Sequence, residues 1–372
     1  MDLYFDNAAT TRLSDKAREA WLYTEKEFYA NPSSVHREGL KARKELDRNR
    51  ELIASRLGVS PSTLFFTSGA TEAIATVLSS LFYLEPGKVI FSRAEHEAVL
   101  SWEPFLKKLG WETVEIRARQ GRVDPMELRS MMTPDVRLVA IMAVNNVTGA
   151  VNDIPALGKV IREKEADCRK RVLFFSDSVQ ALGKIDIRPV LESVDAASFS
   201  AHKLNGPRGI GMLYLKKPEA LRPLAPGGGQ ERGKRGGTEN LPAIAAFRQA
   251  VEEWVPNNER GRIAGLNSYL RRELEKMGLT LLSPEDASPY ILSFASPLPS
   301  EVFTRMLSDK GIAVSSGSAC SNNARGEGER SLSAMGFPPA SAKRAVRVSF
   351  SNSTSMEDVE YLAKAIKEAV NG

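Results

Sequence analysis

Short apolar runs alternate along the chain with longer stretches in which apolar and charged positions recur at helical spacing. The short runs predict β-strands, and the longer stretches predict helices with one buried face. Strands separated by helices of this length imply parallel pairing through right-handed crossovers. The predicted strands of this part lie at 64–67, 88–91, 113–116, 136–142 and 172–175, and the helices between them start at Glu72 or lie at 95–108, 124–131 and 155–165.

Two helices precede this alternating part, and a short strand at 3–6 opens the chain. Ser14 has the side chain of a helix N-cap, so the first helix is expected to run from there to about residue 29. The second helix is highly charged, spans 35–57 and stops at Gly58, a residue type favoured just after a helix.

The pattern changes after residue 240. Helices at 241–254 and 260–277 are expected to carry the chain out of the alternating part. After them, strands at 289–294 and 345–350 and helices at 300–310 and 355–370 predict a smaller α+β unit. We therefore predict an α/β fold with a mostly parallel central sheet, helices on both faces and a smaller α+β domain. The large domain is expected at 15–250 and the small domain at 1–14 and 251–372, a division that suits a chain of 372 residues.

Charge and cysteine content change this picture little. The 51 Lys and Arg residues are interleaved with 46 Asp and Glu residues, which indicates solvated helix faces and argues against a nucleic-acid surface. No apolar stretch approaches the roughly 18 residues of a membrane span, and no signal segment opens the chain, so a cytoplasmic protein is expected. Cys168 and Cys320 are too few and too far apart for a disulfide framework, and no Cys/His cluster has the spacing of a metal site.

Candidate chemistry begins at Lys203, which lies between an apolar run ending at Phe199 and a glycine-interrupted apolar stretch. A lysine that is partly desolvated in this way can have a lowered pKa and form a Schiff base with an aldehyde such as pyridoxal 5'-phosphate. Taken alone, however, a lysine is more often a solvated surface charge.

Asp177 strengthens the case for a cofactor site. Pyridoxal phosphate requires a carboxylate at its pyridinium nitrogen, and Asp177 follows the predicted strand 172–175. Ligands of open α/β sheets bind at the carboxyl ends of strands, so Asp177, Gln180 and Lys203 are expected to converge there. An isolated aspartate at this position would equally suit a helix cap.

A phosphate site is expected where the strand 64–67 turns into a helix through Ser68, Gly69, Ala70 and Thr71. A helix N-terminus offers free N–H groups and a positive dipole end, and the Thr71 hydroxyl is a further donor. By itself this is an ordinary turn between a strand and a helix, and only Lys203 and Asp177 favour binding.

Several short motifs, in order along the chain, together resemble the cysteine desulfurases. This NifS/IscS-like family belongs to the class V aminotransferase family of pyridoxal phosphate enzymes, and the resemblance covers residues 5 to about 350. It implies the fold-type I transferase fold. The motifs are Asn7-Ala-Ala-Thr-Thr11, Asn31-Pro-Ser-Ser-Val-His36, Thr67-Ser-Gly-Ala-Thr-Glu72, Glu95-His96, Asp177-Ser-Val-Gln180, Ser200-Ala-His-Lys203, Gly227-Gly-Gly-Gln-Glu-Arg232, Arg235-Gly-Gly-Thr238 and Ser315-Ser-Gly-Ser-Ala-Cys320.

The resemblance implies a role for particular residues. The catalytic residues would be Lys203, Cys320 and His96, whose ring stacks on the cofactor. Arg347 would grip the substrate carboxylate together with Asn146, and Thr238 would reach the phosphate bound by the neighbouring subunit, which implies a homodimer. The cofactor-binding residues would be Ala70, Thr71, His96, Asn146, Asp177, Gln180, Ser200, His202, Lys203 and Thr238.

The implied reaction converts L-cysteine to L-alanine and leaves sulfur on Cys320 as a persulfide. Cys320 lies in a small, polar, glycine-containing segment, which favours an exposed and reactive thiol. The sulfur would pass to an acceptor protein such as an iron–sulfur scaffold, or to a tRNA-modifying enzyme. Cys168 has no family counterpart and His36 no assigned role.

Three alternatives stay open. A selenocysteine lyase and another fold-type I enzyme such as an aminotransferase share the cofactor motifs, although an aminotransferase needs no mobile thiol. A weakly active sulfur-carrier or scaffold protein that binds the cofactor is the third. Val147 keeps it open, because the family commonly has a glutamate after the asparagine corresponding to Asn146.

Overall fold

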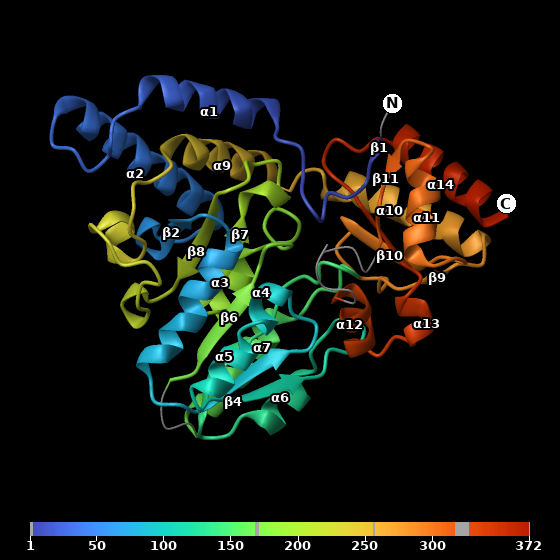
Figure 1. Cartoon of the computed structure of the whole chain (residues 1–372), viewed down its shortest axis with the longest axis horizontal. Coiled ribbons are helices and arrows are strands. Elements are labelled where there is room, and N and C mark those ends of the chain that lie inside the picture. Colours follow the sequence, from blue (N-terminus) through green and yellow to red (C-terminus); the bar gives the residue numbers. More distant parts are fainter. Residues whose placement is uncertain (1–2, 168–170, 256, 317–326, 372) are drawn as a thin grey trace.

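The computed structural model describes residues 3–167, 171–255, 257–316 and 327–371. Among these residues, seven strands form the main sheet in the order β2-β8-β7-β6-β5-β3-β4 (Figure 1). β8 is antiparallel to both of its neighbours and the other pairs are parallel, so the prediction of a mostly parallel sheet is confirmed. The strands are β2 (Leu64–Thr67), β3 (Lys88–Ser92), β4 (Glu112–Ile116), β5 (Val136–Ala140), β6 (Leu173–Asp177), β7 (Ala196–Ser200) and β8 (Gly211–Leu215).

Helices cover both faces of this sheet because alternate strand residues point to opposite sides. In β2, Phe65 packs into one apolar cluster, whereas Leu64 and Phe66 pack into the other. The first cluster includes residues of α3 (Ala70–Ser79), α4 (Glu97–Leu100) and α5 (Glu103–Lys108). The second includes residues of α2 (Arg37–Leu57), α6 (Pro125–Met131), α7 (Ile154–Glu165), α8 (Arg188–Ser193) and α9 (Leu241–Trp254), and α1 (Asp15–Glu27) packs on α9.

A smaller sheet stands beside the main one in Figure 1. Its strands are antiparallel, in the order β12-β13-β10-β9, and a separate parallel pair joins β1 to β11. The bounds at 15–250 and 251–372 stay a prediction. The elements of this part are β1 (Leu3–Tyr4), β9 (Thr280–Leu281), β10 (Ile291–Ala295), β11 (Ile312–Ala313), β12 (Ser315–Ser316), β13 (Ala345–Ser349), α10 (Arg260–Lys276), α11 (Ser300–Ser308), α12 (Glu327–Ala334), α13 (Pro339–Ala342) and α14 (Met356–Asn371).

The helix ends confirm some predictions and correct others. Ser14 caps α1 by accepting a hydrogen bond from the Ala17 N–H, and Gly58 ends α2 with a φ of 71°. The single helix expected at 95–108 is wrong, because α4 and α5 are separate helices. Pro104 lies in the first turn of α5, and proline has no N–H with which to continue a preceding helix.

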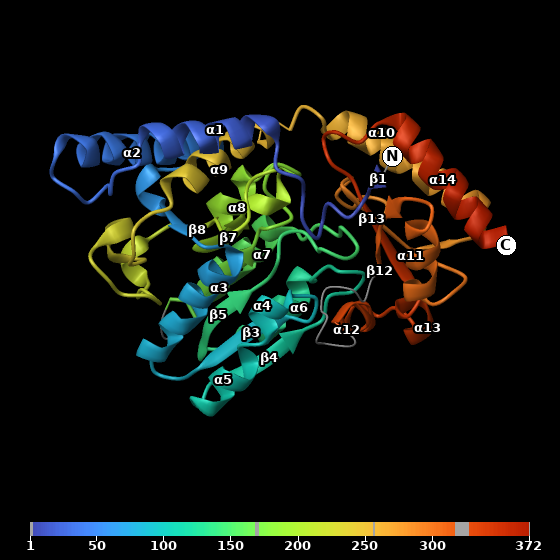
Figure 2. The ribbon, with the colours of Figure 1, turned by 45° about the horizontal axis from the view of Figure 1, so that its top comes forward.

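The first residues of the chain link the two sheets. Asn7 donates a hydrogen bond from Nδ2 to the Ser349 carbonyl of β13 at 2.8 Å, and the Ala8 N–H donates to the Ser349 hydroxyl at 2.8 Å. A few residues later, the Thr11 N–H donates to the His202 carbonyl at the end of β7. In Figure 2 this segment runs from β1 toward α1 between the two sheets.

A buried ion pair holds the glycine-rich segment against the large sheet. Both terminal nitrogens of the Arg50 guanidinium lie 2.7 Å from the Glu231 carboxylate, and the Phe66 N–H donates to the same carboxylate at 2.8 Å. Arg50 belongs to α2 and Phe66 to β2, so Glu231 attaches the short helix η5 (Gln230–Gly233) to both elements. Neither partner is exposed, so removing one would leave an uncompensated buried charge.

We predict that Gly211→Ala destabilises the fold through the turn before α3. A Cβ at this first residue of β8 would lie 2.5 Å from the Phe199 carbonyl oxygen and 2.6 Å from the backbone of Gly69. Because both neighbours are backbone atoms, we expect the free energy of unfolding in urea to fall by about 1–3 kcal/mol.

Gly265→Ala is the matched control for this substitution. Gly265 lies in α10, and nothing comes within 4 Å of an added Cβ. The free energy of unfolding should therefore rise, by up to about 1 kcal/mol. Equal stability of Gly211→Ala and wild type would show that the turn at Gly69 moves freely.

Candidate active site

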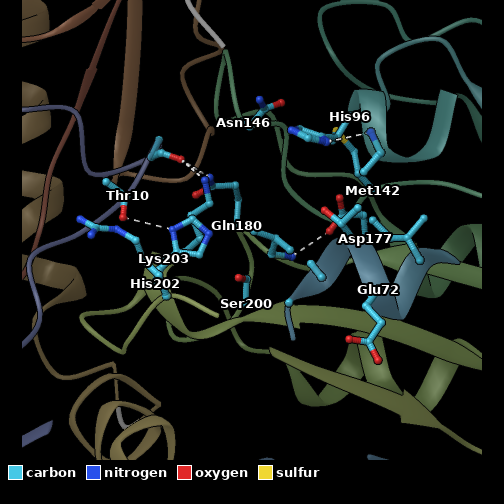
Figure 3. A pocket seen from close by; sticks show the side chains of 18 of the residues that line it. Thr10, Glu72, His96, Met142, Asn146, Asp177, Gln180, Ser200, His202 and Lys203 are labelled. Atoms are coloured by element: carbon cyan, nitrogen blue, oxygen red, sulfur yellow. Dashed lines mark hydrogen bonds between the residues drawn. The ribbon is translucent and has the colours of Figure 1, made fainter. Parts of the chain in front are cut away.

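The carboxyl ends of the parallel strands bring the predicted residues together. β6 ends at Asp177, β7 ends at Ser200, and the short helix η3 (Ala201–Lys203) follows directly. These side chains surround a pocket of about 490 Å³ (Figure 3). The residues expected from the sequence that line it are Ala70, Thr71, His96, Asn146, Asp177, Gln180, Ser200, His202 and Lys203.

Lys203 meets the N-terminal segment at the pocket. Its Nζ donates hydrogen bonds to the carbonyl oxygens of Ala8 at 2.8 Å and Ala9 at 2.7 Å. Gln180 Nε2 donates to the same Ala8 carbonyl at 2.8 Å. Two side chains from the sheet edge therefore share one backbone acceptor from the start of the chain.

Asp177 is a buried carboxylate at the pocket wall. Its Oδ1 accepts hydrogen bonds from the Val179 N–H and the Ser198 hydroxyl, both at 3.1 Å. Burial raises its pKa, although His96 and Lys203 act in the opposite direction. A cationic ring nitrogen in the pocket would restore the charged form, so the position suits a pyridinium partner.

Glu95 lies behind His96 and was not assigned a role from the sequence. The side chain is 4% exposed, its Oε1 accepts from the Met142 N–H at 2.6 Å, and its Oε2 has no partner among the described residues. Burial raises its pKa well above the usual range, and the charge of Asp177 raises it further. Its place next to His96 in the sequence was the available signal, but its burial depends on the tertiary fold.

His96 presents a defined tautomer to the pocket. It is the N-cap of α4, and its Nδ1 accepts a hydrogen bond from the Ala98 N–H at 3.0 Å. A nitrogen that accepts a backbone N–H carries no hydrogen of its own, so the remaining ring hydrogen is on Nε2.

The start of α3 provides donors for an anion. Its N-cap, Gly69, makes no side-chain capping bond, so the first N–H groups of the helix keep their donor capacity. Glu72 in the first turn accepts from the Ser68 N–H at 2.7 Å and pairs with Arg235 at 3.1 Å, so its carboxylate already has partners. Ser200 and His202 line the same pocket.

His202 is a neutral imidazole at ordinary pH. Burial lowers its pKa to about 4, and the charges of Lys203, Arg208 and Lys184 contribute. Its Nδ1 lies 3.1 Å from the Thr10 hydroxyl.

Two of the predicted residues that the structure describes do not line the pocket. Arg347 is 3% exposed and donates to the Asn146 carbonyl at 3.0 Å and to Asp6 Oδ1 at 2.7 Å. Thr238 is exposed at the surface. Cys320 lies outside the described residues, as does Cys168.

The described residues on either side of 317–326 adjoin the site. Ser315 of β12 pairs with Arg347 of β13, and the stretch follows Ser316. On the other side, Arg330 of α12 lies 3.2 Å from Glu97, the residue after His96.

Some lining residues were not predicted individually. Ala8 and Thr10 belong to the quoted motif Asn7–Thr11 and reach the pocket from the start of the chain. Met142 and Arg208 follow β5 and η3. The motif was the signal for the first pair, whereas nothing in the sequence singled out the second pair. His36, which had no assigned role, caps α2 by accepting from the Gly39 N–H at 3.3 Å.

Comparison with known proteins identifies the family. Residues 3–362 match the family described as Aminotransferase class-V. The chain belongs to this family. Class-V aminotransferases generally depend on pyridoxal phosphate, and the buried Asp177 carboxyl, the uncapped start of α3 and the Lys203 amine fit that cofactor.

Relatives within the class-V family cover nearly the whole chain. A "NifS/IcsS protein homolog" of Lactobacillus delbrueckii subsp. bulgaricus is 37% identical over 98% of this chain and 96% of its own. The "Cysteine desulfurase IscS" of Dictyoglomus turgidum is 34% identical over 99% of this chain and 94% of its own. A solved NifS-like protein superposes with a TM-score of 0.92 at 35% identity, with both chains fully covered. The expected fold-type I architecture is thereby confirmed.

The described residues contain neither a metal-binding cluster nor a membrane-spanning helix. No group of three or more His, Cys, Asp or Glu side chains among them is arranged to hold a metal ion. None of the helices within that part of the chain has the length and apolarity needed to cross a bilayer.

We predict that His202 stays neutral in the folded protein down to about pH 4. Nitrogen-15 NMR of the cofactor-free protein should follow its ring, because three histidines can be assigned by single substitution. Since its folded pKa lies below the unfolded value, the unfolded state binds more protons between about pH 6.5 and 4.

Wild type should therefore lose more stability than His202→Gln as the pH falls through this range. A His202 resonance that titrates near pH 6.5 would contradict its burial.

Proposed function

We propose that the protein is a pyridoxal phosphate-dependent cysteine desulfurase, which converts L-cysteine to L-alanine and leaves the sulfur on Cys320 as a persulfide. The observation that carries this proposal is that Asp177, Gln180, His96 and Lys203 line one pocket in a class-V chain. Relatives of this chain are named cysteine desulfurases, and these names do not favour the lyase, aminotransferase or scaffold alternatives.

The pocket residues would hold the cofactor by complementary chemistry. Asp177 would face its ring nitrogen, His96 its ring, Asn146 and Gln180 its polar edge, and Lys203 its aldehyde. The phosphate would lie at the N-terminus of α3, with donors from Ala70, Thr71, Ser200 and His202. Once bound, pyridoxal phosphate supplies an electron-accepting ring that weakens the bonds at the substrate Cα.

Lys203 is the group placed to move a proton at the substrate Cα. Its amine reaches the pocket from η3, where the Ala8 and Ala9 carbonyls hold it at 2.8 and 2.7 Å. Both acceptors are neutral, so the amine can exchange them for substrate without breaking an ion pair with either. His96, with its hydrogen on Nε2, is a second donor for the same reaction.

Arg347 would bind the substrate carboxylate. The Nε of its buried guanidinium has no partner among the described residues, whereas Asn146 and Asp6 accept from the two terminal nitrogens. A planar guanidinium suits a carboxylate, and the Asn146 contact sets Arg347 beside the pocket.

Cys320 would complete the reaction as a thiolate. It attacks the substrate Sγ, an S–S bond forms, the Cβ–Sγ bond breaks, and protonation of the carbon product gives alanine. L-cysteine and one thiol thus yield L-alanine and one persulfide, with no external oxidant or reductant. The described residues on either side of segment 317–326 contact Arg347 and Glu97, and these contacts support the access of Cys320 to the substrate.

Thr238 supports a homodimer with shared sites. Its side chain is exposed and lies outside the pocket of its own chain, as a residue that serves a partner's phosphate must. The Arg50–Glu231 pair anchors the segment that leads to it. The persulfide would then pass to an acceptor such as an iron–sulfur scaffold or a tRNA-modifying enzyme, in the reducing cytoplasm where a free thiol persists.

We predict that Cys320→Ala loses alanine formation from L-cysteine by about a thousandfold or more, as when a catalytic nucleophile is removed. The assay uses the cofactor-loaded protein with a reductant, and mass spectrometry detects the added sulfur on the wild-type peptide that contains Cys320. Cys168→Ala is the matched control, because these two are the only cysteines in the sequence. This variant should retain full activity.

Alanine formation by Cys320→Ala at the wild-type rate would reject the persulfide role in favour of another fold-type I activity. A parallel assay with L-selenocysteine tests the lyase alternative.

We predict that Arg347→Lys raises the KM for L-cysteine by about ten- to a hundredfold, because an ammonium cannot replace bidentate contacts to a carboxylate. Cysteamine, which lacks the carboxylate, should bind wild type and variant equally in a competition assay. If both ligands weaken together, Arg347 acts only through Asn146 and Asp6.

A further inference from the structure

Lys184 is a buried cation next to the pocket, and none of the roles above uses it. It is 2% exposed and does not line the pocket. It follows Gly183, which has a φ of 72° and packs so closely that an added Cβ would lie 2.7 Å from the Cβ of Trp254. The Lys184 amine lies 6.0 Å from the centre of the Trp254 ring. The backbone and one aromatic wall therefore fix where this side chain points.

The amine makes one direct contact to a pocket residue. Lys184 Nζ donates a hydrogen bond to Gln180 Oε1 at 2.7 Å. Burial, with further contributions from the charges of Lys203 and Arg347, lowers the pKa of Lys184 to about 7. An ammonium and a neutral amine both have hydrogens to donate, so this contact persists in either protonation state.

This contact determines how the Gln180 amide is oriented. The ammonium form of Lys184 has donors and no acceptor, and the Ala8 carbonyl can only accept, so the amide oxygen faces Lys184 and the NH₂ group faces Ala8. The opposite end then presents its NH₂ group, and Nε2 donates to the Ala8 carbonyl, which is also an acceptor for Lys203. Lys184, Gln180, Ala8 and Lys203 thus form one continuous chain of hydrogen bonds.

The donor on Lys184 matters because Gln180 is only 3% exposed. If Lys184 lost its amine, the Gln180 oxygen would be buried without this donor, a state that costs free energy. The amide would then keep one of the two hydrogen bonds that hold it, the one to the Ala8 carbonyl.

We propose that Lys184 is a positioning residue, which holds the Gln180 amide with its NH₂ group toward Ala8 and the pocket. In that orientation the amide can donate to an electron-rich oxygen of the ligand. This inference rests on the proposed function for the identity of that ligand, pyridoxal phosphate. The orientation itself rests only on the contacts of Lys184, Gln180 and Ala8.

The first test measures binding of pyridoxal phosphate to the cofactor-free protein by equilibrium titration. Lys184→Met has a side chain of similar length that lacks the N–H donor. It should weaken binding about tenfold, which is the effect of one lost buried hydrogen bond. Lys184→Gln retains an N–H donor without the charge and should bind within about twofold of wild type. Near-ultraviolet circular dichroism confirms that each variant is folded.

A double-mutant cycle separates action through Gln180 from general damage. Gln180→Met should weaken binding by itself, and adding Lys184→Met to it should cause no further loss. If the two effects multiply, or if Lys184→Met binds as wild type does, the positioning role is wrong. Weak binding by Lys184→Gln would show that charge, and not the donor, matters, and would also overturn the proposal.

A second test requires no cofactor and separates this inference from the proposed function. The side-chain NH₂ of Gln180 can be assigned in nitrogen-15 spectra by its disappearance in Gln180→Met. Its hydrogens should exchange slowly with solvent in wild type and Lys184→Gln, and about tenfold faster or more in Lys184→Met. Equal exchange in all three overturns the positioning role, whereas failure of wild type to bind pyridoxal phosphate overturns only the proposed function.

Discussion

The carbonyl oxygens of Ala8 and Ala9 hold the amine of Lys203, and much of the site depends on this contact. Ala8 is itself fixed, because its N–H donates to the Ser349 hydroxyl on β13. The position of the amine is therefore set jointly by the edge of the main sheet, the start of the chain and the smaller sheet. A movement of one sheet relative to the other would therefore break the contact of Lys203 with Ala8 and Ala9 or displace the amine.

Charges of opposite sign are segregated within the site, and burial acts on both. Asp177 ends β6 and Glu95 follows β3, and burial raises the pKa of each carboxyl. Lys184 and His202 lie beside Lys203, and burial lowers the pKa of each. Desolvation thus shifts both the carboxyl groups and the basic groups toward their neutral forms. A ligand with a cation near the carboxyl groups and an anion near the basic groups would favour the charged form of each.

The sequence predicts the parts of this arrangement that depend on local pattern. The apolar run of β2 and the caps Ser14 and Gly58 are local features of this kind. The convergence of Asp177 and Lys203 follows from the rule that ligands of open α/β sheets bind at the carboxyl ends of strands. The break between α4 and α5 was missed because helical spacing continues across it, and only Pro104 marks it. Val147 is buried against the core, so the residue that replaces the usual glutamate is accommodated as an apolar side chain.

The remaining features depend on contacts between distant segments. Lys184 looks like any surface lysine in the sequence, but in the fold it is buried, with its amine 6.0 Å from the centre of the Trp254 ring of α9. The acceptors of Lys203 lie about two hundred residues before it, and although they fall in the Asn7–Thr11 motif, nothing local pairs their carbonyls with this lysine. Such contacts follow from the topology of the whole fold, which local periodicity does not specify.

Arg347 shows how the same topology shapes specificity. Its guanidinium joins three segments, because it extends from β13 to the Asn146 loop and to Asp6 near the start of the chain. Asp6 already supplies one carboxylate, so the pair is neutral and a further carboxylate would leave one excess negative charge. A second additional carboxylate would enlarge that excess beside Asp6, at a higher electrostatic cost. The contact that links the two sheets therefore disfavours more than one further anionic group beside Arg347.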